Sequence, residues 1–275
     1  MAVEAIRLDG PTDRPPFSPS PQTSHRVPMT PAMNDIPLRA SLIAALLCAP
    51  MLAAAQFTGN VALTSNYKFR GQDQDTSKNR AFKPAIQGGL DHAFGETGWY
   101  VGNWNSSVNW LPGNSIESDF YGGYKFAAGG IAWDVGALTY VYPGNSTGNT
   151  TELYGAGTYG PVTLKYAATV SKDYFGYAGY RNDSGLKGTG TGYLSLIVAQ
   201  EIAPSLTLKG AINYTRFASD IRDIGVPSYV DYAVGVSYDF GNGLALYGGV
   251  QGATKKSYFG DINKARAIVT VSKAL

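Results

Sequence analysis

Hydrophobic and polar residues alternate along residues 57–275, and the alternation falls into about twelve short segments. It is clearest in residues 230–240, where one face carries Val230, Tyr232, Val234, Val236, Tyr238 and Phe240 and the other carries Asp231, Ala233, Gly235, Ser237 and Asp239. A period of two is typical of a β-strand, because a helix would scatter both sets around its axis. Gly241, Asn242 and Gly243 follow and suit the positive φ angles of a tight hairpin, so residues 244–254 are predicted as the next strand.

The same period predicts ten further strands, at residues 61–70, 85–94, 100–110, 116–126, 131–141, 151–159, 162–171, 191–201, 206–217 and 264–275. The connectors between them alternate in length. The short ones are residues 95–98, 127–130, 160–161, 203–205 and 241–243, and the long ones are residues 71–83, 111–115, 143–150, 172–190, 218–229 and 255–263. We therefore predict an all-β fold: a single closed antiparallel transmembrane β-barrel of about 12 strands, with short periplasmic turns and longer extracellular loops.

Membrane insertion decides which face of each strand we expect inside. A sheet can cross hydrocarbon only if it closes, and its apolar face then meets lipid while its polar face lines the lumen. In the first predicted strand, the residues expected to face lipid are Val61, Leu63, Tyr67 and Phe69, and those expected to face the lumen are Asn66, Lys68 and Arg70. In the third predicted strand, the residues expected to face lipid are Tyr100, Trp104, Val108 and Trp110, and those expected to face the lumen are Asn103, Asn105, Ser107 and Asn109. A soluble ligand-binding barrel is the alternative, with apolar residues inside.

Aromatic residues near the predicted strand ends suggest two interfacial girdles. The girdle beside the loops would contain Tyr67, Phe69, Trp110, Tyr140, Tyr142 and Phe217, and the girdle beside the turns would contain Phe94, Trp99, Phe126, Trp133, Tyr159 and Phe240.

The N-terminal segment is predicted to lie outside the barrel. Residues 33–55 carry Arg39, an apolar stretch and the small residues Ala53, Ala54 and Ala55, which together indicate a cleaved secretory signal peptide. Residues 1–32 are rich in Pro and Ser, and they indicate either a start codon placed too early or a disordered extension. The domain prediction is thus an extension at 1–32, a signal peptide at 33–55 and an outer-membrane barrel at 56–275.

Composition narrows the class of function. All 19 Tyr and all 4 Trp follow residue 55, and that part of the chain holds 18 Lys and Arg against 16 Asp and Glu. The near balance of charge gives nucleic-acid binding little support. Cys48 is the single cysteine and lies in the predicted signal peptide, so the barrel has no thiol with which to hold a zinc or iron–sulfur site.

The predicted lumen contains charges of both signs. Its candidate lining residues are Lys68, Arg70, Asp91, Glu117, Asp119, Lys125, Asp134, Glu152, Lys165, Lys209, Asp231, Asp239 and Arg266. We predict a porin-like channel for passive diffusion of small polar solutes, in contact with outer-membrane lipid and without strong ion selectivity. Arg70 could hold an anionic group, anchor the following loop in the mouth, or pair with a neighbouring strand. The alternative is a non-conducting barrel with a structural or surface-interaction role.

Enzymatic and cofactor chemistry finds little support. His92 shares its predicted face with Leu90 and Phe94, which is a poor place for a Ser-His triad, and no Gly-x-Ser-x-Gly motif occurs in the barrel, so a barrel hydrolase is the least favoured alternative. Residues 155–160 match a dinucleotide-binding pattern, but a strand is predicted to follow where that motif needs a helix. Asp73 and Asp75 could bind a divalent cation, although two carboxylates in a solvated loop ordinarily bind none tightly. No cofactor and no metal are predicted.

Several segments also resemble a known family. These are LTSNYKFRG at 63–71, PAIQGG at 84–89, DFYGGY at 119–124, YVYPG at 140–144, TELYG at 151–155 and SKDYFG at 171–176, and they are similar to the TorF-type porins of Gram-negative bacteria. Asn66 stands where an acidic residue is expected, and the first loop differs. The resemblance implies an outer-membrane barrel and a pore, and it brings no catalytic or ligand-binding residue. The oligomeric state stays open at this point.

Overall fold

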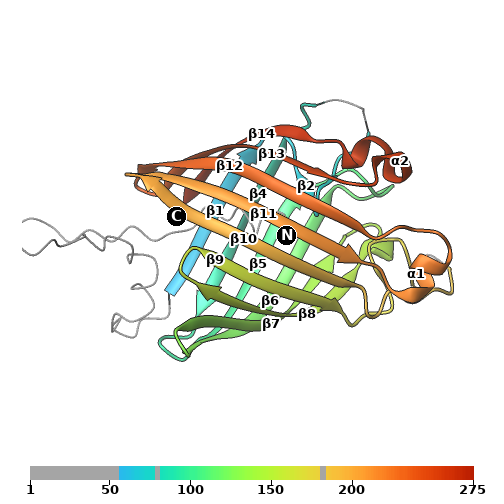
Figure 1. The fold of residues 1–275 in the computed structure, drawn as a ribbon, viewed down its shortest axis with the longest axis horizontal. Helices are drawn as coiled ribbons and strands as arrows, with labels where there is room; N and C mark the ends of the chain where they lie inside the picture. The colour runs from blue at the N-terminus through green and yellow to red at the C-terminus, as the bar shows by residue number, and fades with distance from the viewer. Residues whose placement is uncertain (1–55, 78–80, 180–183) are drawn as a thin grey trace, which may run out of the picture.

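Each long strand pairs with its neighbour in sequence, and the last pairs with the first, which closes an antiparallel barrel of twelve strands (Figure 1). The computed structural model describes residues 56–77, 81–179 and 184–275. The barrel strands are β1 (Gln56–Thr64), β4 (Ala85–Ala93), β5 (Trp99–Ser107), β6 (Ile116–Ala128), β7 (Ile131–Val141), β8 (Thr150–Tyr159), β9 (Val162–Thr169), β10 (Gly192–Ala203), β11 (Leu206–Arg216), β12 (Tyr229–Gly241), β13 (Leu244–Ala253) and β14 (Arg266–Ala274). The predicted closed all-β barrel is confirmed; the predicted extension and signal peptide lie outside the described residues.

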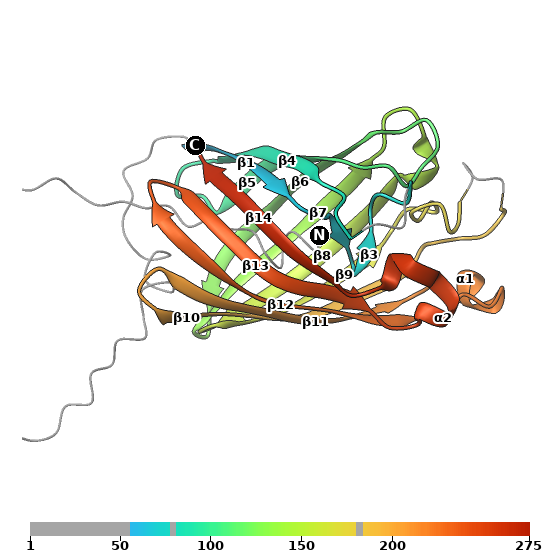
Figure 2. The ribbon, with the colours of Figure 1, turned by 90° about the horizontal axis from the view of Figure 1, so that it is seen from above.

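The two ends of the barrel differ as the alternating connectors predict. Tight turns close one end, and Asn242 and Gly243 adopt the expected positive φ angles of 53° and 76°. The long connections at the other end contain η2 (Ser146–Gly148), α1 (Ser219–Asp223), α2 (Lys256–Phe259) and η3 (Gly260–Asn263) (Figure 2). No helix in the described part of the chain has the length and apolar character needed to cross a membrane.

The outer face of the barrel is largely apolar. Side chains that point away from the axis include Leu164, Leu196, Ile212, Val234, Val250 and Val269, and all of them are exposed. This arrangement would be costly in water, but it suits hydrocarbon. The soluble barrel with an apolar interior is therefore the poorer description of this fold.

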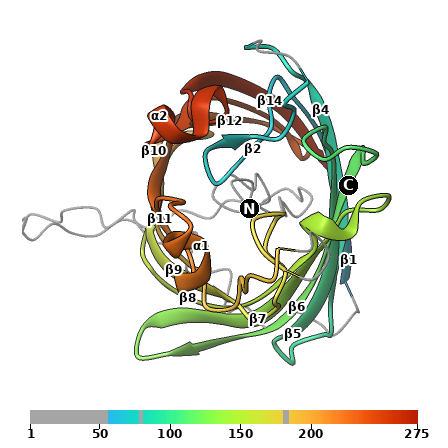
Figure 3. The ribbon, with the colours of Figure 1, turned by 90° about the vertical axis from the view of Figure 1, so that its right-hand side faces the viewer.

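The predicted first strand is too long. β1 ends at Thr64, and the chain then turns into the barrel, where two short strands, β2 (Lys68–Phe69) and β3 (Gln72–Asp73), pair with each other (Figure 3). Tyr67 and Phe69 are buried inside instead of facing lipid. Their alternation continues that of β1, so the sequence pattern carries no mark of the change in direction.

The faces of β5 are the reverse of those predicted. Trp104 is buried in the lumen with its ring 5.6 Å from that of Tyr67, and the Tyr100 hydroxyl donates a 2.6 Å hydrogen bond to Asp134. Asn103 and Asn105 consequently lie on the outer face. The prediction treated aromatic residues as lipid-facing, whereas here they fill the interior because carboxylates and the inserted loop provide partners for them.

Only one of the two aromatic girdles forms. The predicted turn-side residues are exposed on the outer surface: Phe94, Trp99, Phe126, Trp133, Tyr159 and Phe240. The predicted loop-side set is wrong, because five of its members are buried within the barrel: Tyr67, Phe69, Tyr140, Tyr142 and Phe217. These rings belong to the hydrophobic core of the protein, which sits inside the barrel at its loop end.

Candidate functional site: the barrel interior and its inserted loop

The predicted lumen residues occupy two levels of the interior. Those nearer the long loops, called the loop-side layer, are Lys68, Arg70, Glu117, Asp119, Glu152, Asp231 and Arg266, and all of them are buried. Those nearer the tight turns, called the turn-side layer, are Asp91, Lys125, Asp134, Lys165, Lys209 and Asp239, and all of them are half-buried or exposed. The strands alternate in the same way at both levels, so the difference lies in what the loops contribute.

The loop-side layer is filled by the connection between β1 and β4, called the inserted loop (residues 65–84, described at 65–77 and 81–84). Its β2–β3 hairpin turns at Arg70 and Gly71, whose φ angles are 48° and 75°. Positive φ at both central residues is the geometry of a two-residue type I′ hairpin. Glycine is required at the second position, because a Cβ on Gly71 would lie 2.7 Å from the carbonyl oxygen of Gly252 in the barrel wall.

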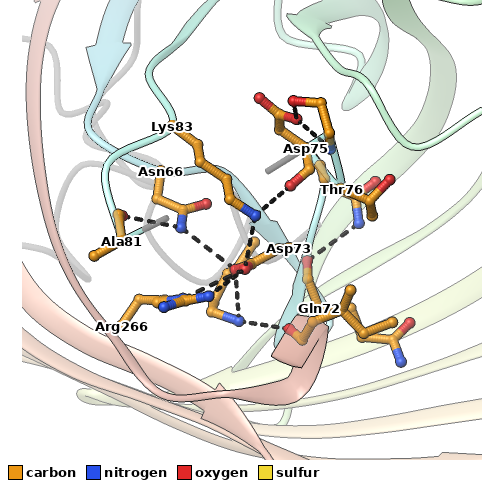
Figure 4. Close-up of polar contacts among 12 residues, drawn as sticks. Asn66, Gln72, Asp73, Asp75, Thr76, Ala81, Lys83 and Arg266 are labelled. Atoms are coloured by element: carbon orange, nitrogen blue, oxygen red, sulfur yellow. Dashed lines mark hydrogen bonds and ion pairs between the residues drawn. The ribbon is translucent and has the colours of Figure 1, made fainter. Parts of the chain in front are cut away.

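The carboxylate of Asp73 on the inserted loop contacts three cations, among which Figure 4 labels Lys83 and Arg266. Asp73 lies 2.9 Å from Lys68, 3.4 Å from Lys83 and 3.2 Å from Arg266, and every one of these side chains is at most 6% exposed. Lys68 and Lys83 belong to the loop, whereas Arg266 begins β14. Asp73 therefore both braces the hairpin and ties it to the barrel wall, and the cluster has an excess of positive charge.

Lys68 is the most enclosed of these cations. Its ammonium group also donates hydrogen bonds to the backbone carbonyls of Gly71 and Ile262, at 2.9 and 2.8 Å. Burial lowers the pKa of Lys68 to about 8, and the attraction of Asp73 opposes this shift only in part. Lys68 therefore loses its charge at a lower pH than a solvent-exposed lysine does.

Arg70 fixes the tip of the hairpin to the opposite wall. One guanidinium nitrogen lies 2.9 and 2.7 Å from the two carboxylate oxygens of Glu152 on β8, and the other donates to the Tyr174 hydroxyl at 3.0 Å. The guanidinium carbon lies 4.2 Å from the ring centre of Tyr193 and 4.9 Å from that of Phe69. Of the roles considered for Arg70, the geometry shows the anchoring of the loop, through an ion pair across the barrel.

A third anchor joins the inserted loop to β6. The hydroxyl groups of Tyr67 and Tyr142 donate hydrogen bonds of 2.7 and 2.6 Å to the two oxygens of Glu117, which is fully buried. Nearby, Asp231 accepts from Tyr193 at 3.1 Å and from Asn213 at 2.7 Å. Buried carboxylates in this layer are thus held by tyrosine and amide donors as well as by cations, and the inserted loop touches β6, β8 and β14.

The turn-side layer is more open and keeps a polar lining. The Tyr121 hydroxyl donates to Asp91 at 2.6 Å, while Tyr100 hydrogen-bonds to both Asp134 and Tyr154. Lys125 and Lys165 place their ammonium groups 4.6 and 4.2 Å from the ring centres of Tyr100 and Tyr154. Charged and phenolic groups with partial exposure suit a water-filled vestibule on this side of the inserted loop.

A cavity of about 140 Å³ lies at the loop end of the barrel, against the inserted hairpin. Its lining comes from the inserted loop, from the connections that follow β5, β9, β11 and β13, and from the start of β12, and it includes Arg70, Gln72, Trp110, Tyr177, Phe217 and Tyr229. Arg70 thus lines this cavity while its guanidinium pairs with Glu152 on β8, so the tip of the hairpin forms part of the cavity wall.

Sequence reasoning missed Asp73 and Lys83 as members of the interior. Asp73 was expected in a solvated loop; instead it is buried and ion-paired, and Asp75 accepts hydrogen bonds from Ser77. One signal was present: Arg70 and Gly71 separate two short stretches with strand-like alternation, which is a weak indication of a hairpin. Nothing in that pattern says that the hairpin folds inward.

The other candidate chemistry lies elsewhere. His92 sits on the outer face, with its ring 4.2 Å from that of Phe57 and 4.6 Å from that of Phe94, away from the lumen. Residues 155–160 belong to β8 and the turn that leads into β9, so a strand follows the glycine pattern, as predicted. In the described residues, no group of three or more His, Cys, Asp or Glu side chains is placed to hold a metal ion.

Comparisons with known proteins agree with the barrel. The family model described as "Bacterial protein of unknown function (Gcw_chp)" matches residues 50–274. A KdgM porin aligns at 11% identity with a TM-score of 0.50, covering 78% of this chain and 98% of its own. A NanC porin aligns at 12% identity with the same TM-score of 0.50, covering 80% of this chain and 98% of its own. At these identities the likeness concerns the fold alone.

Two further comparisons add little. Outer membrane phospholipase A from Escherichia coli aligns at 15% identity over 86% of this chain and 98% of its own, but its TM-score of 0.41 is too low to bear on activity. No curated protein matches the chain. The porin-like barrel expected from the TorF resemblance is supported, while membership of the TorF family itself stays a prediction.

Proposed function

The chain belongs to the Gcw_chp family of bacterial proteins of unknown function, and we propose that it is an outer-membrane channel for passive diffusion of small polar solutes. The proposal includes export by a cleaved signal peptide, contact with outer-membrane lipid, kinship with the TorF-type porins and no enzymatic activity. The observation that carries it is that the polarity of the barrel is opposite to that of a soluble one. Apolar side chains cover the outside, and charged and phenolic side chains line the turn-side interior.

The inserted loop makes this channel a constricted one. Its hairpin and the buried loop-side layer stand between the outer cavity and the turn-side vestibule, and the packed side chains leave the carboxylates of Glu117 and Glu152 no more than 1% exposed. Diffusion therefore requires the hairpin to move or its neighbours to separate. Because charges of both signs line the path in nearly equal number, we expect weak ion selectivity.

A specific observation also supports the non-conducting alternative. Ion pairs and hydrogen bonds join the inserted loop to three strands, β6, β8 and β14. An inserted loop held this firmly could stay in place and keep the barrel closed. The protein would then be a closed outer-membrane barrel that serves through its loops or its wall. Conductance separates the two functions.

The experiment compares the wild type with a loop-deleted variant in planar bilayers. Thr64 and Ala85 are paired neighbours, so a short Gly-Ser linker can replace residues 66–83 without breaking the barrel. Heat-modifiable migration on a gel verifies that both proteins are folded. We expect small or rare current steps from the wild type and steps at least several-fold larger from the variant.

Two results would contradict the proposal. If neither folded protein produces discrete steps, the barrel does not conduct and the structural alternative holds. If both produce the same large steps, ions pass by a route that the inserted loop does not constrict. A control that replaces residues 96–97 in the β4–β5 turn should leave the conductance of the wild type unchanged.

A further inference from the structure

Two asparagines on β5 interrupt the apolar outer face. Asn103 and Asn105 point away from the axis two residues apart on one strand; the other outward carboxamide of the described strands, Gln200, lies by itself near the turn end of β10. Two serines extend the polar area: Ser107 on β5, and Ser118 on β6, which pairs with Asn105. The two asparagines and the two serines are together called the carboxamide patch. Exposed apolar side chains surround it, among them Ile86, Leu90, Val101 and Phe120.

The depth of the patch places it within the hydrocarbon. Trp99 starts β5 in the turn-side girdle, where its ring lies 5.0 Å from that of Tyr124. Asn103 and Asn105 follow four and six residues later, and a strand tilted by about 40° climbs roughly 2.5 Å per residue along the membrane normal. They therefore lie about 10 and 15 Å above the girdle, inside an apolar band about 25 Å tall.

The patch is linked internally but is only half satisfied. Asn105 donates to the side-chain oxygen of Asn103 at 2.5 Å, Ser118 donates to Asn105 at 2.8 Å, and Asn103 donates to the backbone carbonyl of Asp119 at 2.9 Å. Each carboxamide has two N–H donors and two acceptor lone pairs. These bonds use one of each, so every asparagine retains one donor and one acceptor, for which acyl chains provide no partner.

We propose that the carboxamide patch is the contact surface of a symmetric dimer, with a second copy of this chain as its occupant. Two copies inserted with the same orientation and related by a two-fold axis along the membrane normal bring the same residues together at the same depth. Each carboxamide then meets a group that both donates and accepts.

Small side chains let the two walls approach. Gly88 pairs with Asn105 on the β4 side, and Ser118 pairs with it on the β6 side, so the amides are flanked by little bulk. Small residues allow close backbone approach in membranes, and polar side chains then hydrogen-bond across the contact. The apolar residues around the patch would seal the interface from lipid. This inference rests on the proposed membrane location and is independent of conductance.

Cysteine cross-linking tests the proposal in the membrane. The chain has a single cysteine, Cys48, so S107C and S118C variants in a C48S background place one thiol in the patch and leave both asparagines in place. After oxidation of outer-membrane vesicles, we expect at least one of the two variants to give a disulfide-linked dimer as its main species. The control L164C carries its thiol on exposed Leu164, on β9, and should stay monomeric. Equal cross-linking of all three variants, or none in any, would overturn the proposal.

A second measurement needs no cysteine. The purified wild type in a mild detergent should have the protein mass of two chains, and the N103L/N105L variant that of one chain, because leucine removes the donors and acceptors but suits a lipid-facing position. Q200L, which alters an outward carboxamide on β10, a strand that pairs with none of β4, β5 and β6, should remain a dimer. A monomeric wild type, or a dimer that survives the double substitution, contradicts the proposed dimer. Binding of another protein or of a lipid to the patch, in place of a second copy of the chain, also contradicts it.

The two proposals fail in different ways. Absence of heat-modifiable migration and of membrane insertion would remove the membrane location on which both rest. A folded, inserted and monomeric protein that conducts would remove the dimer alone. A folded, inserted dimer without current steps would remove the channel alone.

Discussion

The two halves of the lumen are built from the same residue types but differ in how far their side chains are exposed. Both contain carboxylates, basic side chains and tyrosines, yet Glu117 and Glu152 near the loops are at most 1% exposed, whereas Asp91 and Asp134 near the turns are half-buried. The strands contribute alternating inward residues to both halves. The difference comes from the inserted loop, which brings Tyr67, Arg70 and Asp73 to the loop-side half and covers the carboxylates there.

Two lessons about barrel interiors follow from this contrast. A charged residue on an inward strand face is a candidate for a functional role only where water reaches it. At the loop end of this barrel, most such charges instead hold the inserted loop in place. Ion pairs that are worth little at a surface become structurally decisive when both partners are enclosed, because removal of one leaves the other unpaired at low dielectric. The turn-side half keeps the features expected of a solute path.

The largest effect should come from removing the carboxylate at the centre of the loop-side layer. D73A leaves Lys68, Lys83 and Arg266 buried without their shared counter-charge, so we expect a loss of about 3–5 kcal/mol in the free energy of unfolding, or release of the inserted loop. Urea unfolding in lipid vesicles, followed by tryptophan fluorescence, measures the first outcome, and a rise in conductance reveals the second.

The matched control for this substitution is D239A in the turn-side layer. Asp239 is half-buried and accepts a 2.7 Å hydrogen bond from the backbone of Gly241. Its loss should cost no more than about 1 kcal/mol, because water can replace the carboxylate. Equal effects of the two substitutions on stability would mean that the halves of the lumen do not differ as described.

A smaller effect is expected at the tip of the hairpin. G71A places a methyl group within 2.8 Å of the side chains of Asp231 and Ala253 on a residue with a φ of 75°, so we expect a cost of about 2–3 kcal/mol. Gly129 offers the comparison, since its φ is 62° and no atom lies within 4 Å of its Cβ position. G129A should therefore cost about 1 kcal/mol, from backbone strain alone. If G129A is as damaging as G71A, the tip of the hairpin is not packed against the wall.

The smallest expected effect is a dependence of stability on pH. Because burial lowers the pKa of Lys68 from 10.5 to about 8, the folded chain holds fewer protons than the unfolded chain between those pH values. Stability rises with pH wherever the unfolded state binds more protons, by at most about 1.4 kcal/mol per pH unit for one group. The free energy of unfolding of the wild type should therefore rise by about 1 kcal/mol from pH 8 to pH 9 relative to that of K68M. Parallel pH curves for the two proteins would show that Lys68 titrates normally and is not enclosed.

Much of the fold could be predicted from the sequence because lipid and lumen impose opposite demands on alternate residues. That alternation, together with turn residues such as Asn242 and Gly243, located the barrel strands, their antiparallel order and the apolar outer face of strands such as β12. Every predicted lumen residue is placed inside the barrel, either on an inward strand face or in the inserted loop. Whether any of them governs passage of a solute stays a prediction.

Only the tertiary structure decided which of these residues meet and which meet water. The period that ends β1 continues into the inserted loop, so the inward turn after Thr64 has no local signal; it depends on partners at Glu117, Glu152 and Arg266, which are distant in sequence. On β5, the alternation defined two faces but could not say which of them lies inside the barrel. An aromatic ring can be covered either by lipid or by the inserted loop. Local pattern thus fixes periodicity, while the choice of side follows from contacts that form only when the barrel closes.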